Sequence, residues 1–184
     1  MKDKTIVYQA KSFYNAYIAL EQIYNNTNET MFLVPVIVNG CFSIEITLKA
    51  ILKNNDIKYK NEHNLVVLYN KLPTEIQKMI NDWVLEKTPE YKDDSRINEE
   101  LLIISGAYNQ WRYCFDNEPA SIDTCFVSSF ANAVIGVMFS LGLNVDLTEE
   151  IVTNNEIDMV SHKIEENRKQ FIEKNKEYIK KKEQ

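Results

Sequence analysis

Two charged residues interrupt a stretch of the sequence that is otherwise almost entirely apolar. Glu45 and Lys49 lie within "CFSIEITLKAIL", residues 41–52. Since four residues span about one helical turn, both side chains would project from one narrow strip of a largely apolar helix. Two interpretations are open. Either the strip is a solvated edge, along which lysine side chains reach water past apolar neighbours, or Glu45 is partly buried and paired with a cation from another element.

Arg112 is the first candidate for that cation, because the chain has only three arginines, Arg96, Arg112 and Arg168. It lies in "AYNQWRYCFD", at the edge of an aromatic stripe that includes Tyr108 and Trp111. A guanidinium suits both a carboxylate and a stacked aromatic ring. The alternative is a rim arginine that pairs with Asp116, four residues further along the same helix.

His63 is the candidate for proton transfer, because an imidazole titrates near neutral pH. It opens "HNLVVLY", where a capping or packing role is the alternative, whereas His162 lies in a polar tail and is expected to be solvated. A polar pocket is therefore predicted around these groups, with aromatic rings that could stack on a base. Its predicted members are Glu45, Lys49, His63, Asn64, Tyr108, Trp111, Arg112, Tyr113 and Asp116.

Other chemistries lack their motifs in this sequence. No G-x-x-x-x-G-K-[ST] loop, G-x-G-x-x-G turn or C-x-x-C pair is present, and the chain has two histidines. No cofactor and no metal are therefore predicted. Cys41, Cys114 and Cys125 are odd in number and lie within apolar stretches. They are expected to be reduced core thiols of a cytoplasmic protein, and no signal peptide is recognised.

The charge is uneven along the 184 residues. The net charge is −6, and residues 163–184 hold eight Lys/Arg and five Glu, a balance of +3, so residues 1–162 carry −9. An acidic body argues against broad binding of a phosphate backbone, although a small basic site is compatible with it.

Helical spacing dominates the chain, and only four Gly and four Pro interrupt it. The predicted fold is all-α, an up-and-down bundle of four to five core helices over residues 1–146, followed by a long charged helix over 147–184. The expected helices cover about 4–25, 31–53, 63–72, 73–87, 96–115 and 120–141, with Ser95 as one N-cap and Thr74 as a partial cap. Residues 31–52 are long enough to cross a bilayer, but Glu45 and Lys49 would be costly there, so no membrane is expected.

Four segments in this order resemble the prokaryotic HEPN superfamily of small helical domains. They are "SFYNAYIALEQI", "VNGCFSIEITLKAIL", "HNLVVLYNKLP" and "AYNQWRYCFD", and the similarity spans about residues 10–140. The resemblance implies a helical bundle, often a homodimer, in toxin–antitoxin or antiphage-defence systems. It also implies partners such as RNA, a nucleotide, a cognate antitoxin or another defence protein.

Many HEPN proteins are metal-independent ribonucleases that use an R-x(4–6)-H motif, in which the histidine moves protons and the arginine neutralises phosphate. No histidine follows an arginine at that spacing in this chain. The leading hypothesis is therefore a degenerate module that binds a partner protein, nucleotide or RNA. One alternative is a ribonuclease in which His63 and Arg112 meet in space. The other is a purely structural dimerisation module with the charged tail as its arm.

Overall fold

The computed structural model describes residues 4–91, 94–112 and 122–144, together with Glu166, Lys169 and Glu173. Of residues 94–95 and 107–112 it describes the backbone alone. The chain divides into two compact units, Met1–Val145 and Asp146–Gln184. In the second unit the three described residues are helical and exposed, so the charged helix expected over 147–184 lies almost wholly outside the described residues.

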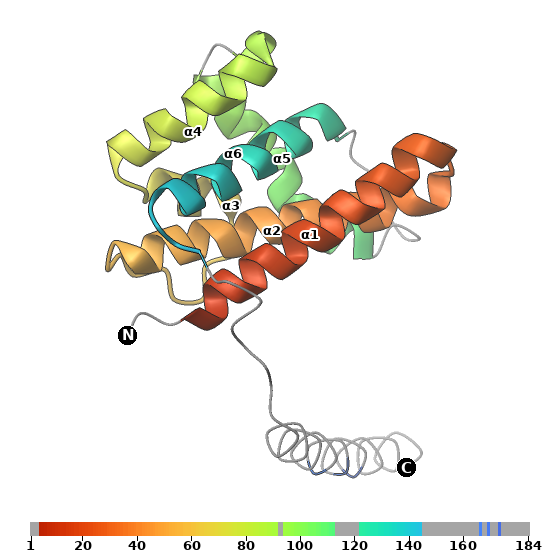
Figure 1. Cartoon of the computed structure of the whole chain (residues 1–184), viewed down its shortest axis with the longest axis horizontal. Helices are drawn as coiled ribbons and strands as arrows, with labels where there is room; N and C mark the ends of the chain where they lie inside the picture. The colour runs from red at the N-terminus through yellow and green to blue at the C-terminus, as the bar shows by residue number, and fades with distance from the viewer. Residues whose placement is uncertain are drawn as a thin grey trace, which may run out of the picture. The chain divides into compact units, whose positions relative to one another are not determined.

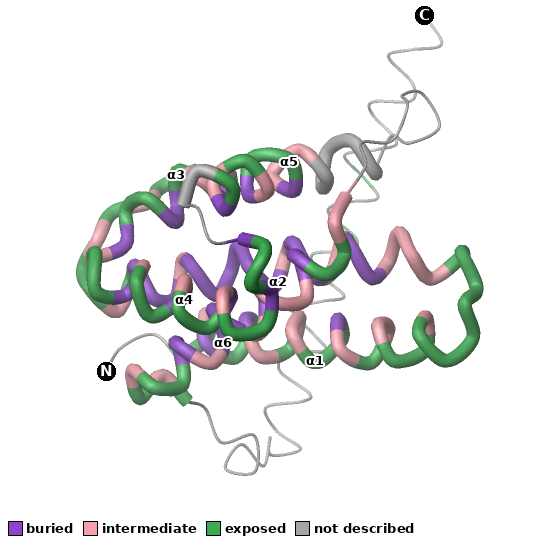
Figure 2. Tube along the Cα trace, turned by 90° about the horizontal axis from the view of Figure 1, so that it is seen from above, coloured by how far each residue is buried: buried purple, intermediate pink, exposed green. Residues whose placement is uncertain are grey.

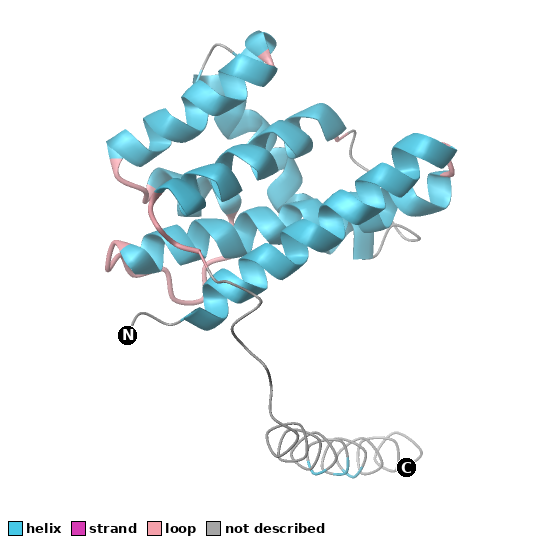
Figure 3. Ribbon diagram, in the orientation of Figure 1, coloured by secondary structure: helices cyan, strands magenta, loops and turns pink. Residues whose placement is uncertain are grey.

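The described part of the first unit is a bundle of α-helices without strands, which confirms the all-α prediction (Figures 1 and 3). In chain order the elements are α1 (Lys4–Thr27), the 3-10 turn η1 (Thr30–Phe32), α2 (Leu33–Asn54), α3 (Leu65–Asn70), α4 (Thr74–Lys87), the 3-10 turn η2 (Pro89–Tyr91), α5 (Asp94–Arg112) and α6 (Thr124–Ser140).

Helix α2 is the central element, as its nearly all-round apolar sequence predicts. It contacts α1, α3, α5 and α6, and Figure 2 shows buried residues along much of its length. The short connection through η1 makes α1 and α2 an antiparallel pair, which Figure 1 shows side by side. Helix α4 packs mainly on α6 and on the turn η2.

Gly40 lies where α2 meets both α1 and α6. A Cβ atom there would lie 2.7 Å from Val127 Cγ1 and 3.1 Å from the ring of Tyr17. Tyr17 is fully buried. Because glycine weakens a helix interior, its place here follows from the packing of three helices.

Three local expectations need correction. The predicted N-cap Ser95 lies inside α5, which begins at Asp94. Thr74 is the first residue of α4, whose N-cap position is Pro73 without a side-chain cap hydrogen bond. Helix α6 begins at Thr124, because the Asp123 carboxylate accepts the backbone N–H groups of the two residues at its N2 and N3 positions.

The cysteine expectation is correct for one residue and wrong for another. Cys41 is buried, and burial raises the pKa of its thiol to about 12. Cys125 is exposed, because it lies in the first turn of α6, ahead of the buried part of that helix. Cys114 lies outside the described residues.

By length and composition alone, the segment Thr30–Asn54 could cross a membrane. Of the 18-residue apolar stretch within this segment, 56% is buried inside the bundle. The central helix of a globular core passes the same test, so this finding is weak evidence for a membrane span.

Candidate functional site

Glu45 is a buried carboxylate with two partners. Its side chain is 12% exposed, and its Oε1 atom lies 2.6 Å from Lys49 Nζ and 2.9 Å from His63 Nδ1. Lys49 is 14% exposed, and its ammonium also lies 6.0 Å from the ring centroid of Tyr59. Of the two interpretations of the charged strip, the structure therefore supports burial of Glu45, with one cation from its own helix and an imidazole from another element.

The loop between α2 and α3 brings His63 to Glu45, eighteen residues away in sequence. Glu62 fixes the end of this loop, because its Oε1 atom accepts the backbone N–H groups of His63 at 2.9 Å and Asn64 at 2.8 Å. These hydrogen bonds, that of Asn64 first, lower the pKa of the Glu62 carboxyl although burial opposes them. The peptide on both sides of the imidazole is thus held in place.

Asn64 has a structural role in this arrangement. Its Oδ1 atom accepts the N–H of Val67 at 3.2 Å and so caps α3. The next N–H group, that of Leu65, donates to Ser105 Oγ of α5 at 2.9 Å, and Ser105 in turn donates to the carbonyl of Leu101 at 2.6 Å. Helix α5 therefore anchors the start of α3, directly beside His63.

The geometry fixes the hydrogen-bonding state of the imidazole. The ionised carboxylate of Glu45 is only an acceptor, so Nδ1 of His63 must carry the hydrogen of the shared bond. In neutral His63 the lone pair is therefore on Nε2, on the opposite side of the ring. The His63 side chain is 75% exposed, so the neutral form can present this lone pair to a ligand at the surface. A buried carboxylate that orients an exposed imidazole is suited to acid–base chemistry or to hydrogen bonding of a surface ligand.

The space around this pair is small. A pocket lined by Glu45, His63 and Ser105, with apolar walls from Phe42 and Ile104, leaves ≈ 10 Å³ for the centre of a water molecule. That is room for about one water. A base or nucleotide does not fit inside it, so a ligand of that size would contact His63 from the surface.

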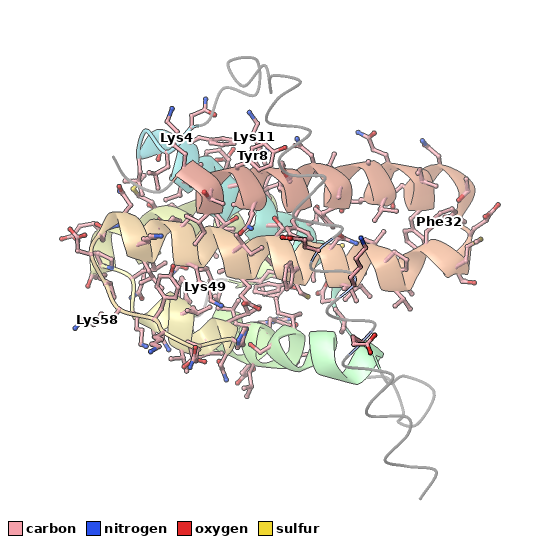
Figure 4. The ribbon with its side chains drawn as sticks, turned by 90° about the horizontal axis from the view of Figure 1, so that it is seen from below. Lys4, Tyr8, Lys11, Phe32, Lys49 and Lys58 are labelled. Carbon is pink, nitrogen blue, oxygen red and sulfur yellow. The ribbon has the colours of Figure 1, made fainter. Side chains whose placement is uncertain are left out.

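Figure 4 shows how the lysines of this region are placed. Lys49 lies on the side of α2 that faces α3, and Lys58 lies at the outer edge of the loop that follows α2. Lys58 and Lys60 are both exposed. The labelled residues of α1, Lys4, Tyr8 and Lys11, lie on the opposite side of α2.

The side chains of the other predicted pocket residues are not described by the structure. Tyr108, Trp111 and Arg112 lie in α5, of which only the backbone is described there, and Tyr113 and Asp116 lie outside the described residues. Arg112 follows Ser105 by seven residues, which places its backbone on the same face of α5, about 10 Å further along the axis. The predicted pairing of Arg112 with Glu45 or Asp116 stays a prediction.

Sequence reasoning missed Glu62 and Ser105, which position His63 through backbone N–H groups. No pattern reveals such bonds, whereas Asn64 before an apolar run was a readable capping signal. In the described ranges, no three His, Cys, Asp or Glu side chains form a group that could hold a metal ion. Comparison of the chain with protein-family models, curated proteins and solved structures finds no match.

Proposed function

We propose that this chain is a HEPN-like helical module that binds single-stranded RNA on the surface formed by α2, α3 and the loop between them, with His63 at its centre. The observation that carries the proposal is the bond between buried Glu45 and exposed His63. It holds an imidazole in one orientation at the surface, where it can meet a ligand too large for the pocket beneath it.

RNA is favoured over a free nucleotide because the pocket beside His63 admits about one water. Small-molecule sites are usually concave and bury most of their ligand, whereas a strand can lie along an open surface. Single-stranded binders combine cations that follow the backbone with aromatic rings on which bases stack. The loop supplies exposed Lys58 and Lys60 on either side of half-buried Tyr59.

The charges of the loop determine the expected affinity for RNA. Lys58 and Lys60 are accompanied by Asp56 and Glu62 in the same loop, and the Glu62 carboxylate is engaged by two backbone N–H groups. Few phosphate contacts are therefore available, and each contributes a slope of only about −0.7 to the dependence of log affinity on log salt for single strands. The expected binding is weak and depends only modestly on salt.

The test is fluorescence polarisation of a labelled single-stranded RNA of mixed sequence with the purified full chain, at several salt concentrations. We expect both His63→Ala and the double variant Lys58→Gln/Lys60→Gln to weaken binding about tenfold or more, the latter with a shallower salt slope. The matched control is Lys78→Gln/Lys87→Gln, which removes two exposed lysines from α4. Wild-type protein that does not bind RNA, or a control that weakens binding equally, would refute the proposal.

A second function is favoured by the same hydrogen bond, namely cleavage of the bound RNA without a metal. Nε2 of His63 would accept the proton of a ribose 2′-hydroxyl, whose oxygen attacks the neighbouring phosphorus while the 5′-oxygen leaves with a proton from water. The products are a 2′,3′-cyclic phosphate and a 5′-hydroxyl. Arg112 would neutralise phosphate charge, as the resemblance implies.

Cleavage is tested separately from binding. Labelled RNA is incubated with the chain in excess EDTA, and the ends of the products are analysed. An enzyme would lose at least about a hundredfold in rate in His63→Ala and a comparable amount in Arg112→Ala, with unchanged circular dichroism. Binding without cleavage would leave the degenerate module as the function.

The setting of the protein remains part of the proposal. The resemblance supports a cytoplasmic homodimer in a toxin–antitoxin or antiphage-defence system, with a cognate antitoxin or defence protein as a further partner. The purely structural alternative makes the tail a dimer arm. If deletion of residues 148–184 leaves the number of chains per particle in light scattering unchanged, the arm hypothesis is wrong.

A further inference from the structure

A second and larger pocket lies between α1, α2 and the first turns of α6. It offers ≈ 230 Å³ to the centres of water molecules, and its lining includes Glu21, Tyr24 and Asn25 of α1 and Ser128 of α6. None of these residues belongs to the surface around His63. The pocket combines one carboxylate, an aromatic ring and neutral oxygen acceptors.

A hydrogen bond from a buried tyrosine holds the carboxylate of Glu21 in place. The fully buried Tyr17 donates its hydroxyl hydrogen to Glu21 Oε1. Burial first, and the hydrogen bond to Glu21 second, raise the pKa of Tyr17 far above its ordinary value. The pKa of Tyr14 is also raised, first by burial and then by the negative charge of Glu21. A fixed negative charge therefore borders the pocket.

Nothing in the described part of the chain neutralises that charge. The ion pairs there join Lys49 and His63 to Glu45, Lys78 to Asp82 and Lys87 to Glu86, and none includes Glu21. A half-buried carboxylate is stabilised by a cation. The described residues that line the pocket include no lysine or arginine, so a bound ligand can supply the cation.

The start of α6 does not turn the pocket into an anion site. A helix N-terminus attracts anions through its exposed N–H groups. Here the Asp123 carboxylate accepts the N–H groups of Cys125 at 2.9 Å and Phe126 at 3.2 Å, and it adds a negative charge of its own. An anion at the helix start would thus meet the Asp123 carboxylate, and an anion inside the pocket would meet Glu21, whereas the Glu21 carboxylate favours a cation in the pocket.

We propose that this pocket binds a small organic ammonium group. An ammonium has three hydrogens to donate, and the pocket offers the Glu21 carboxylate, the amide oxygen of Asn25 and the hydroxyl of Ser128. The ring of Tyr24 adds a face for a cation–π contact. The volume is below that of usual drug-sized sites, so an alkyl amine fits and a nucleotide does not. The group arrives either on a free diamine or on a lysine side chain of another protein.

The experiment is calorimetric titration of the full chain with three probes. They are 1,4-diaminobutane, Nα-acetyl-lysine N-methylamide, and the neutral 1,4-butanediol. We expect at least one amine to bind about tenfold or more tightly than the diol, because a charge-assisted hydrogen bond is lost in the diol. Binding by the diamine alone identifies a free amine as the source, and binding by the lysine derivative alone identifies a protein side chain.

Variants locate the binding. Glu21→Gln keeps the shape of the side chain and removes its charge, and it should weaken amine binding about tenfold. Glu29→Gln, an exposed change after the end of α1, is the matched control and should have no effect. Tyr24→Leu should weaken amine binding severalfold without involving the Tyr17 hydrogen bond. If neither amine binds better than the diol, or if Glu21→Gln binds like the wild type, the proposal is overturned, whatever the result of the RNA experiments.

Discussion

Replacing Glu45 by leucine should destabilise the bundle, because it leaves the ammonium of Lys49 without its carboxylate in a largely buried position. The N–O distance is 2.6 Å, and the two side chains are 14% and 12% exposed. With an effective dielectric constant of about 20 the attraction at that distance is about 6 kcal/mol, most of which offsets the loss of hydration. Breaking a fully buried pair costs about 3–5 kcal/mol. Since Lys49 keeps some access to water, we expect about 2 kcal/mol.

The double variant Glu45→Leu/Lys49→Met should recover most of that loss. Two apolar side chains of similar size leave no charge buried, so the stability should lie within about 1 kcal/mol of the wild type. If Lys49→Met alone costs about 1 kcal/mol, because His63 still contacts Glu45, the coupling free energy of the double-mutant cycle would be about 2 kcal/mol. At about 2–4 °C per kcal/mol for a chain of this size, Glu45→Leu lowers the Tm by about 4–8 °C. The measurement is urea and thermal unfolding followed by circular dichroism at 222 nm.

The chain contains a matched control for this cycle. Lys78 and Asp82 form an ion pair with the same N–O distance, 2.6 Å, and the same spacing of four residues, but their side chains are 74% and 59% exposed. The cycle of these two residues should give a coupling of about 0.5 kcal/mol or less. Equal couplings for the two pairs would refute the reasoning, because the difference in burial should outweigh the reversed order of the two charges.

Three further predictions follow from the packing and the titratable groups. Gly40→Val should destabilise the bundle by about 2–4 kcal/mol, because its side chain would meet two neighbouring helices at less than contact distance; an unchanged midpoint in urea would contradict this packing. Asp123→Ala should cost about 1–2 kcal/mol at neutral pH through loss of the α6 cap. Burial alone would raise the pKa of Asp123, but the hydrogen bonds from a buried tyrosine and two backbone N–H groups lower it below 3.8. Its stabilisation is therefore present above about pH 4 and lost as the pH falls through the lowered folded-state pKa, so wild type and variant should converge in acid unfolding. In a Cys114→Ser background a thiol reagent at pH 8 should label exposed Cys125 quickly, and Cys41 only on unfolding; rapid labelling of two thiols in the folded protein would argue against the burial of Cys41.

Local structure was largely predictable from the sequence. Helical spacing of apolar residues predicts the first helix, and the apolar run around Glu45 predicts a central helix. Helix starts were less predictable. Asp123 serves as a cap, whereas Ser95, a residue of the same capping class, lies inside α5. The side chain of a residue alone does not decide whether a helix extends past it, because packing of the preceding turn also contributes.

The candidate site was predictable in its members and not in its geometry. Glu45, Lys49 and His63 stand out as polar residues in apolar or junction positions. Their burial and pairing depend on the course of a ten-residue loop that starts at Asn55 and ends at Asn64, where α3 begins. The small volume beside His63 depends on how closely Ile104 and Ser105 approach from α5. Neither the burial and pairing of these residues nor the volume of the pocket can be read from a sequence pattern.

The sequence by itself determined that this protein is a helical bundle around one apolar helix that carries a carboxylate and a lysine one turn apart. The reason is that helical hydrogen bonds and one-turn pairs join residues close together in the chain. Only the tertiary structure decided that His63 meets Glu45, that Ser105 receives the N–H of Leu65, and that Glu21 borders a cavity whose described lining contains no lysine or arginine. Those contacts join distant segments, and they form only where the packing of several helices makes up for the entropy of bringing them together.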